Sequence, residues 1–186
     1  ENPLVSIITP CYNGENVMHR LLDSILSQTY SNIEFILIND GSTDHSEEIW
    51  YQYEKKFNEK GIKTIYIHQR NQGLGAAINA GLKVFTGDYL CWPDIDDYFE
   101  DTSVEKRVNF LETHKEYGSV SSDANQYMED NLSEPVGTMA SWLKHKEDEW
   151  QFEWLLKGQS LFCSGCHMLR TTSFLDVNPD RYIYPA

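Results

Sequence analysis

The feature that most constrains the fold is a regular alternation of short apolar segments with amphipathic segments in the first half of the chain. The apolar segments begin about 30 residues apart, which is the length of a βαβ unit. The first three are rich in β-branched residues, and we expect strands that are buried on both faces. The four apolar segments are residues 4–9, 33–38, 62–67 and 89–92.

The segments between the expected strands have the period of an amphipathic helix. Strand and helix therefore alternate, which predicts an α/β fold with a mostly parallel, doubly wound sheet. Ligands of such sheets bind at the carboxyl ends of the strands. At the start of the second helix, Asp44 and Glu47 have the spacing of a capping box. The apolar stripes of the three helices contain Val17, Leu21, Leu22, Ile25 and Leu26; Ile49, Tyr53 and Phe57; and Leu74, Ala77, Ile78, Gly81, Leu82 and Phe85.

The second half of the chain is less regular. Residues 102–118 predict a helix, and the period places Val104, Val108 and Leu111 on its inward face. The other expected elements are strands at residues 119–128 and 160–170, and a loop with a Trp-rich helix at residues 132–156.

The chain of 186 residues carries a formal net charge of -14, and its Lys and Arg residues form no basic stripe. We therefore expect no nucleic-acid partner and no surface for anionic membranes. No apolar run reaches the roughly 18 residues that span a bilayer, so we expect no membrane segment within this chain. Without a repeat, a low-complexity tract or an interdomain linker, residues 1–186 are expected to form a single domain.

The start of the sequence lacks a basic region followed by a long apolar core, so we expect no signal peptide. Four cysteines are too few for a disulfide scaffold in a chain of this length. We expect them to be reduced and the protein to be cytoplasmic. Any attachment to the inner face of a membrane would be made through a longer parent protein.

Polar, glycine-bearing and acidic residues follow each of the four expected strands. After the fourth, Asp94, Asp96 and Asp97 are crowded together, and their repulsion is costly beside an apolar strand unless a cation neutralises it. Carboxylate oxygens are ligands that suit Mg²⁺ or Mn²⁺. The sequence therefore predicts a divalent-cation site at one edge of the sheet. The four stretches are TPCYNGE (residues 9–15), NDGSTD (39–44), HQRNQGLGAA (68–77) and PDIDD (93–97).

Together and in this order, the four stretches resemble the motifs of the family 2 glycosyltransferases, which are P-x-Y-N, D-G-S-x-D, N-x-G and D-x-D. The resemblance covers residues 1–100 well and the remainder loosely. It implies the GT-A fold, a Rossmann-like three-layer sandwich around a mostly parallel central sheet. Residues 1–100 would be the nucleotide-binding half, and residues 101–186 the acceptor-side half, truncated at its C-terminus.

The resemblance implies an inverting transfer of a sugar from a nucleoside-diphosphate sugar, with uridine as the expected base. The acceptor would be a hydroxyl of a saccharide or of a lipid-linked molecule. A divalent ion, Mn²⁺ or Mg²⁺, would stabilise the charge on the departing diphosphate as a Lewis acid. The alternative is a nucleotide-sugar-binding domain without catalytic activity. A nucleotidyltransferase is disfavoured, because TPCYNGE is not a Gly- and Arg-rich loop.

The resemblance also assigns roles to residues of the four motifs. Asp96 is implied as the direct metal ligand and Asp94 as a neighbour of the metal or the ribose, with Asp97 as an alternative ligand. Asp40 is implied to accept a hydrogen bond from the ring N–H of uracil. The other implied nucleotide-binding residues are Pro10, Tyr12 (stacked on the base), Arg70, Asn71 and Gly73.

Ordinary structural roles are the alternatives for the same residues. The aspartates of PDIDD could cap the following helix. Asp40 could be a turn residue before Gly41. Tyr12 could pack under the rim of the sheet, and Arg70 could lie on the surface without a ligand.

The family implies a carboxylate that acts as general base on the acceptor hydroxyl. That carboxylate follows the region equivalent to residues 166–186, so we expect it beyond Ala186. Asp123, Asp176 and Asp180 are not convincing substitutes.

Residues 163–167, CSGCH, match the haem attachment string C-x-x-C-H. The expected cytoplasmic location argues against haem, and the chain has no second Cys/His pair at the spacing of a zinc site. We expect a strand and a turn here, beside the acceptor pocket. An aromatic set could stack on an acceptor sugar or pack in the core; it comprises Trp142, Trp150, Phe152 and Trp154.

Overall fold

The computed structural model describes residues 2–128, 130–139 and 164–183 of the chain. Strand and helix alternate through the first half, as the sequence predicts. In chain order the elements are β1 (Val5–Cys11), α1 (Met18–Leu26), β2 (Ile33–Asp40), α2 (Ser46–Glu59), β3 (Lys63–Gln69), α3 (Leu74–Leu82), β4 (Tyr89–Cys91), α4 (Ser103–Thr113), β5 (Ser119–Ser121), β6 (Asn125–Gln126), β7 (Gly137–Thr138), the 3₁₀ turn η2 (Ser164–Cys166), β8 (His167–Arg170) and α6 (Thr171–Val177).

The central sheet has six strands in the order β3-β2-β1-β4-β8-β5. β1 pairs in parallel with β2 and β4, and β2 pairs in parallel with β3. β8 runs antiparallel to β4 and to β5. The predicted α/β fold with a mostly parallel sheet is confirmed. Because β1 to β4 run in the same direction, the loops that follow them lie at one edge of the sheet.

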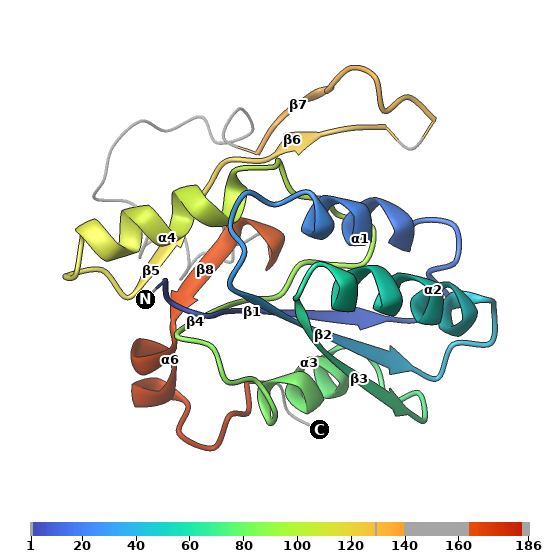
Figure 1. Cartoon of the computed structure of the whole chain (residues 1–186), viewed down its shortest axis with the longest axis horizontal. Coiled ribbons are helices and arrows are strands. Elements are labelled where there is room, and N and C mark those ends of the chain that lie inside the picture. Colours follow the sequence, from blue (N-terminus) through green and yellow to red (C-terminus); the bar gives the residue numbers. More distant parts are fainter. Residues whose placement is uncertain (1, 129, 140–163, 184–186) are drawn as a thin grey trace, which may run out of the picture.

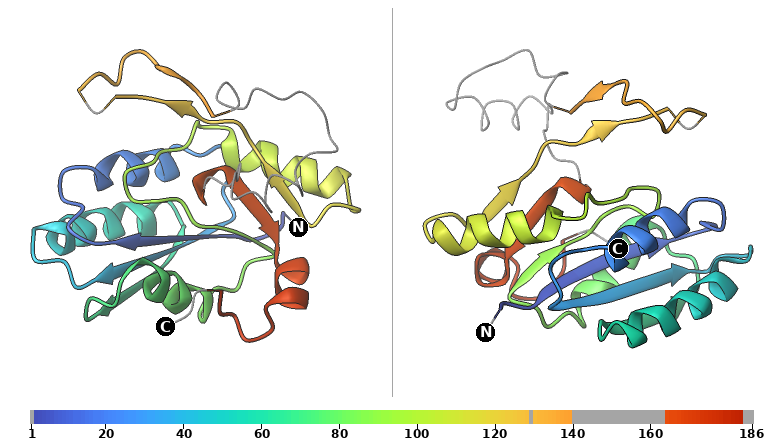
Figure 2. Two further views of the ribbon diagram at one scale, coloured as in Figure 1. Left: turned by 180° about the vertical axis from the view of Figure 1, so that it is seen from behind. Right: turned by 45° about the horizontal axis from the view of Figure 1, so that its top comes forward.

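Helices cover both faces of the sheet, so the domain has three layers (Figure 1). α1, α2 and α4 share one core with the sheet, and α3 and α6 pack in a second core on the opposite face. The β6–β7 hairpin lies outside the sheet on the side of α1 and α4 (Figure 2). Within the described part of the chain, none of the helices has the length and hydrophobicity that a membrane span needs.

The larger core contains an aromatic cluster between β2, β3 and α2. The ring of Phe35 stacks on that of Phe57 with centroids 5.2 Å apart. The Trp50 ring lies 5.7 Å from Phe35 and 5.9 Å from Tyr66. The predicted stripe of α2 contains Tyr53 and Phe57 but omits Trp50, which is fully buried. Tertiary packing from β3 therefore widens the buried face of α2 beyond the predicted stripe.

α3 approaches the sheet closely because Gly81 has no side chain. A Cβ at Gly81 would lie 2.3 Å from Cγ2 of Ile8 and 3.0 Å from Cδ1 of Ile38. One predicted member of the α3 stripe is wrong, since Leu74 is 58% exposed. Leu74 is the first residue of the helix, and the buried face begins at Ala77.

β3 departs from the prediction that the strands are buried on both faces. β1 and β2 are buried along their whole length. β3 is an edge strand, and its residues are half-buried or exposed. The order of strands in the sheet decides which strand is an edge, and the local apolar pattern carries no information about that order.

The second half of the chain also differs from the prediction. The expected strand at residues 119–128 is divided, because β5 joins the main sheet and β6 pairs with β7. The expected helix at residues 102–118 is α4, which ends at Thr113. α6 is not predicted by the sequence pattern. The aromatic set from Trp142 to Trp154 lies outside the described residues.

The predicted capping box at the start of α2 is wrong in one half. Asp44 Oδ1 accepts hydrogen bonds from the N–H of Ser46 at 3.0 Å and from its hydroxyl at 2.6 Å. The Glu47 carboxylate does not reach back to complete the box. It accepts hydrogen bonds from the hydroxyls of Tyr66 at 3.0 Å and Tyr51 at 3.3 Å. Tyr66 on the adjacent edge strand is a competing donor that local sequence does not reveal.

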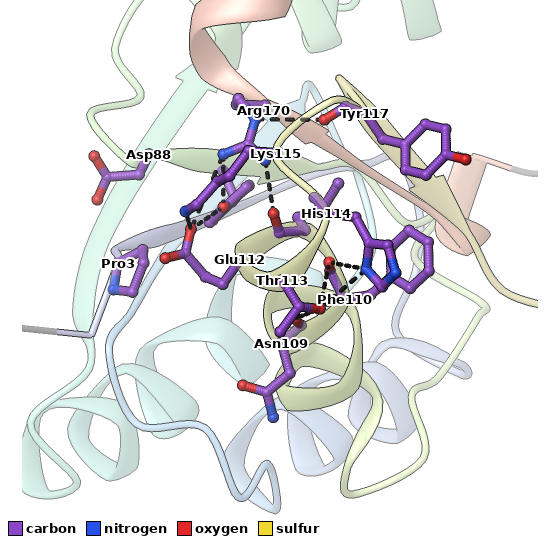
Figure 3. Close-up of polar contacts among 12 residues, drawn as sticks. Pro3, Asp88, Asn109, Phe110, Glu112, Thr113, His114, Lys115, Tyr117 and Arg170 are labelled. Atoms are coloured by element: carbon purple, nitrogen blue, oxygen red, sulfur yellow. Dashed lines mark hydrogen bonds and ion pairs between the residues drawn. The ribbon is translucent and has the colours of Figure 1, made fainter.

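Arg170 of β8 connects the sheet to the end of α4 (Figure 3). Its Nη1 donates to the hydroxyl of Tyr89 at 2.9 Å, and its Nη2 donates to the carbonyl of Leu111 at 2.8 Å. The Tyr89 hydroxyl in turn donates to Glu112, which pairs with Lys115 at 2.9 Å. This network lies at the amino end of β4, opposite the edge that carries the predicted motifs.

Candidate functional site

The loops that follow β1 and β2 are hydrogen-bonded to each other. Asn13, whose φ is 52°, donates from its N–H to Ser42 Oγ at 3.0 Å and accepts from the N–H of Thr43 at 2.8 Å. The N–H of Glu15 donates to Asp44 Oδ2 at 3.0 Å. These side chains therefore hold the two loops together, which explains why Asn, Asp and Ser are concentrated there.

Pro10 and Tyr12 lie on either side of the end of β1. Pro10 is buried in the strand, in register with Ile38 of β2. Tyr12 is 53% exposed, so it does not pack under the rim of the sheet. An exposed aromatic ring on a loop that its neighbours hold in place can stack on a nucleotide base.

Asp40, at the end of β2, holds the loop between β3 and α3. Its side chain is almost fully buried. Oδ1 accepts from Gln69 Nε2 at 2.8 Å and from the N–H of Gln72 at 2.9 Å, and Oδ2 accepts from the N–H of Gly73 at 2.8 Å. An ionised carboxylate has about four acceptor positions, so about one remains for a ligand. Asp40 is thus an organiser of the loop, with little capacity left for the predicted contact to the base.

The same loop approaches Gly41 closely. Gly41 has a φ of +73°, and a Cβ there would lie 2.7 Å from the backbone nitrogen of Asn71. Gly73 has a φ of +87° and open space around the position of a Cβ. Arg70, Asn71 and Gly73 are all exposed. The predicted nucleotide-binding residues of the third motif therefore lie on one exposed loop, fixed from below by Asp40.

The acidic stretch after β4 lies against the loop that follows β1. A Cβ at Gly14 would be 3.2 Å from Cγ1 of Ile95, so the two loops are in contact. The N–H of Asp97 donates to the carbonyl of Asp94 at 3.2 Å. Burial, together with the charges of Asp94 and Asp96, raises the pKa of Asp97 to about 6. The crowding of carboxylates that the sequence predicts is therefore present in the fold.

The acids after β4 have the donor chemistry of a divalent-ion site but do not form a complete site by themselves. Among the described residues, no group of three or more His, Cys, Asp or Glu side chains is arranged to hold a metal. Mg²⁺ sites commonly use one or two protein carboxylates, with substrate phosphates and water as the other ligands. Asp94 and Asp96 supply two carboxylates, and the donor set is oxygen alone, which suits Mg²⁺ or Mn²⁺.

A pocket of about 620 Å³ opens beside the acidic stretch. Asp96 and Asp97 form part of its lining, together with residues from the rest of the loop after β4, from α1, α4 and η2, and from the β6–β7 hairpin and the loop before it. Tyr98 and Tyr127 lie in the lining with ring centroids 6.0 Å apart. The predicted nucleotide-binding residues after β1, β2 and β3 are not among the described residues of this lining. The pocket therefore extends from the acids toward the second half of the chain.

The three carboxylates considered as general bases are separated by the fold. Asp123 lines the pocket. Asp176 lies in α6, which packs on the opposite face of the sheet, and Asp180 follows that helix. The expectation of a base beyond Ala186 stays a prediction.

The CSGCH segment contributes a turn to the site. Within it, the turn η2 is followed directly by strand β8, which agrees with the predicted turn and strand. Cys166 is buried, as are Cys11 and Cys91. Gly165 and Cys166 both line the pocket.

Among the residues of the pocket that sequence reasoning missed is Arg107 of α4. It is 5% exposed and lines the pocket. A signal for it exists, since Arg107 follows Val104 by three positions and precedes Leu111 by four, which places it on the buried face of the helix. A charged residue inside an apolar stripe indicates a buried polar contact.

Residues 6–177 match the model of the family described as glycosyl transferase family 2. An uncharacterized glycosyltransferase of Rickettsia prowazekii is 44% identical over 110 residues, which are 59% of this chain and 32% of that protein. Glycosyltransferase GlyA of Streptococcus pneumoniae is 46% identical over 101 residues, 54% of this chain and 14% of that protein. The match to this chain thus spans about a third or less of these relatives.

Two solved structures show the same fold at low sequence identity. S. aureus TarS in complex with UDP has a TM-score of 0.65 and 21% identity, with 95% of this chain and 49% of that chain covered. The mannosyltransferase PcManGT from Pyrobaculum calidifontis, in complex with GDP-Man and Mn²⁺, has a TM-score of 0.68 and 16% identity, with 96% and 47% covered. These neighbours confirm the predicted GT-A fold. Because the family model spans most of its length, the chain belongs to glycosyl transferase family 2.

Proposed function

We propose that this chain is the donor-binding domain of a divalent-metal-dependent glycosyltransferase, which transfers a sugar from a UDP-sugar with inversion. The observation that carries the proposal is the crowding of three carboxylates within four positions after β4, where Asp96 and Asp97 line the pocket. Such repulsion is tolerable where a cation is bound. The family membership supports the transfer reaction, and the position of the acids at the carboxyl edge of a parallel sheet supports a nucleotide ligand.

The donor nucleotide would lie along the loops after β1, β2 and β3. The exposed ring of Tyr12 offers a stacking face for the base. Asp40 fixes the loop that carries Arg70 and Asn71. The exposed guanidinium of Arg70 can pair with a diphosphate oxygen. In this proposal Asp40 contributes mainly by preorganising the loop.

Asp94 and Asp96 would hold a Mn²⁺ or Mg²⁺ ion, which when bound stabilises the negative charge on the departing diphosphate. The PcManGT structure with GDP-Man and Mn²⁺ supports a divalent ion in this fold. Uridine rests on TarS, which was solved with UDP. PcManGT was solved with GDP-Man. If this chain binds GDP more tightly than UDP, guanosine replaces uridine as the proposed base.

The acceptor would enter the pocket beside Asp96 and Asp97. Its volume of about 620 Å³ is within the usual range for small-molecule sites. The aromatic pair Tyr98 and Tyr127 offers ring faces, and the lining also contains amide and carboxylate groups. This mixture suits a saccharide or the sugar end of a lipid-linked acceptor.

A calorimetric titration with UDP, GDP, ADP and CDP, with and without Mn²⁺, tests the proposal. We expect UDP to bind more tightly than the other three and Mn²⁺ to increase its affinity. Asp96→Ala should abolish the effect of Mn²⁺, whereas Asp101→Ala, an exposed aspartate five positions further along the chain, should retain it. If no nucleotide binds more tightly with the metal present, the proposal is wrong.

Activity separates the enzyme from the rival reading of a binding domain without turnover. Slow hydrolysis of a UDP-sugar that requires Mn²⁺ and is absent in Asp96→Ala would support the enzyme. Tight metal-dependent binding without hydrolysis or transfer would support the binding domain.

A further inference from the structure

Arg107 is a buried cation without an acidic partner among the described residues. Its side chain donates from Nη1 to the carbonyl of Gly165 at 3.0 Å and from Nη2 to Ser122 Oγ at 2.8 Å. Its Nε is buried and has no hydrogen-bond acceptor in the part of the chain that the structure describes. The guanidinium lies 5.2 Å from the centre of the Phe99 ring. A buried charge of this kind costs several kcal/mol unless other interactions compensate it, so neutral packing would be the more stable choice.

The contacts of Arg107 converge on the turn η2. Gly165 accepts from Arg107, and the next carbonyl, that of Cys166, accepts from the N–H of Ser122 at 3.0 Å and from its hydroxyl at 3.3 Å. Ser122 also receives a hydrogen bond from Arg107. Arg107 and Ser122 thus hold η2 from α4 and from the end of β5, although about 40 residues of chain separate β5 from the turn.

The other side of the turn lies against Asp97. A Cβ at Gly165 would be 2.8 Å from Oδ2 of Asp97 and 3.6 Å from its Cγ. Gly165 does not have a positive φ, so its backbone does not require glycine. A Cβ at position 165 would instead compete with the Asp97 carboxylate for space. The position of that carboxylate therefore depends on η2, and the position of η2 depends on Arg107.

We propose that Arg107 and Gly165 are positioning residues that fix the Asp97 carboxylate in the pocket wall, where its charge adds to those of Asp94 and Asp96 in attracting a divalent ion. This inference rests on the proposed function in one respect, which is that the ligand of the acids is a divalent ion. Lys at position 107 would keep the charge but not the planar fork that reaches Gly165 and Ser122 together.

A set of single and double variants tests the proposal, with the Kd of UDP in saturating Mn²⁺, measured by calorimetry, as the readout. Gly165→Ala, which displaces only the end of a flexible side chain, and Asp97→Asn should each raise this Kd about tenfold. In the Asp97→Asn background, Gly165→Ala should add less than about twofold, because the carboxylate on which it acts is gone. Arg107→Lys should raise the Kd in the wild-type background and not in the Asp97→Asn background.

Control measurements distinguish a displaced Asp97 carboxylate from a general loss of structure in the variants. Lys106→Arg is a matched exchange of Lys and Arg at an exposed position of α4 and should leave the Kd unchanged. UDP affinity without metal should be the same in wild type and in all variants. If Arg107→Lys fails to fold, the double-mutant cycle of Gly165→Ala with Asp97→Asn still tests the positioning role, together with a crystal structure of Gly165→Ala. The crystal structure should show the Asp97 carboxylate displaced.

The possible outcomes distinguish this inference from the proposed function. If Gly165→Ala binds as the wild type does, or if the effects of Gly165→Ala and Asp97→Asn multiply to about a hundredfold, the positioning role is wrong while the metal site stands. If the wild type itself binds UDP no more tightly with Mn²⁺, both proposals are overturned.

Discussion

The carboxylate of Asp40 accepts a hydrogen bond of 2.8 Å from the backbone N–H of Gly73, across 33 positions of the chain. A second backbone hydrogen bond, of 2.9 Å, comes from Gln72. Both N–H groups belong to the loop that leads into α3, so the end of β2 determines the shape of the loop after β3. An acidic residue is favoured at position 40 because the groups around this side chain donate hydrogen bonds, and a carboxylate presents only acceptor atoms to them.

Asp40→Asn should weaken both the fold and nucleotide binding. An amide group presents an N–H₂ to at least one of the donors, which leaves a buried N–H without an acceptor at a cost of about 1–3 kcal/mol. We expect a lower free energy of unfolding in urea, faster hydrogen exchange at Gln72 and Gly73, and weaker UDP binding. The exposed matched variant Asp101→Asn should change none of these. Unaltered exchange at Gln72 and Gly73 in Asp40→Asn would contradict this role.

Tyr12→Ala should reduce UDP affinity and leave the stability of the fold unchanged. The ring is 53% exposed, so its removal uncovers little of the core. Stacking of a base on an aromatic side chain is worth about 1–3 kcal/mol by alanine substitution. Tyr12→Phe retains the stacking face and should bind UDP as the wild type does. Equal UDP affinities of Tyr12→Ala and Tyr12→Phe would show that the base lies elsewhere.

Tyr89→Phe should destabilise the domain without affecting the nucleotide site. The lost hydroxyl accepts from Arg170 at 2.9 Å and donates to Glu112, so both partners lose a contact. Burial and the hydrogen bond to Glu112 raise the pKa of Tyr89 to about 12, so the hydroxyl is protonated at neutral pH. We expect a loss of about 1–2 kcal/mol in urea unfolding.

The matched control for Tyr89→Phe is Tyr117→Phe. Tyr117 is 51% exposed, and its contact with Arg170 is made by its backbone carbonyl rather than its hydroxyl. This variant should differ from wild type by less than about 0.5 kcal/mol. If both variants lose the same stability, the network at Arg170 does not stabilise the junction of β8 and α4.

Glu34 should make the fold sensitive to acid. Burial is the largest influence and favours the neutral form, but hydrogen bonds from Lys63, Ser6 and Thr86 together outweigh it and hold the pKa of Glu34 below its ordinary value of 4.5. A pKa that is lower in the folded state stabilises the fold above the unfolded pKa. This contribution is lost as the pH falls from about 4.5 through the lowered pKa of the folded state.

Glu34→Gln therefore has two expected effects, both measured by urea unfolding between pH 3 and pH 7. At pH 7 the variant should be less stable by about 2–4 kcal/mol, because an amide cannot satisfy the donors of Lys63 and Thr86. Below about pH 4.5 its stability should fall less steeply with pH than that of the wild type. The exposed control Glu59→Gln should follow the wild-type curve, and a wild-type slope in Glu34→Gln would refute the assignment.

The fold was largely predictable because its information is local. The short apolar segments and the helical period identify β1 to β4 and α1 to α4, since each element must bury a face that its own sequence displays. The order of the strands is not local, so the exposure of β3 as an edge was not predictable. The burial of Trp50 was not predictable either, because Tyr66, which covers it, belongs to that edge strand.

The candidate site was predictable only as a set of residues at one edge. Strand ends identify Asp40 and Asp94, but not what their side chains bind, because the partners of Asp40 are the side chain of Gln69 and two backbone N–H groups, all 29 or more residues away. The contact between Asp97 and Gly165 joins two halves of the chain that no motif connects. Arg107 had a local signal in the helical period, although its partners did not.

The central claim is that a divalent ion binds among the acids after β4 and contacts a diphosphate. Crystals soaked with Mn²⁺ and UDP, measured for anomalous scattering, test it most directly. The account predicts one strong manganese peak within about 2.5 Å of a carboxylate oxygen of Asp96 or Asp94 and of the UDP diphosphate. A diphosphate bound without a manganese peak beside these carboxylates would contradict it.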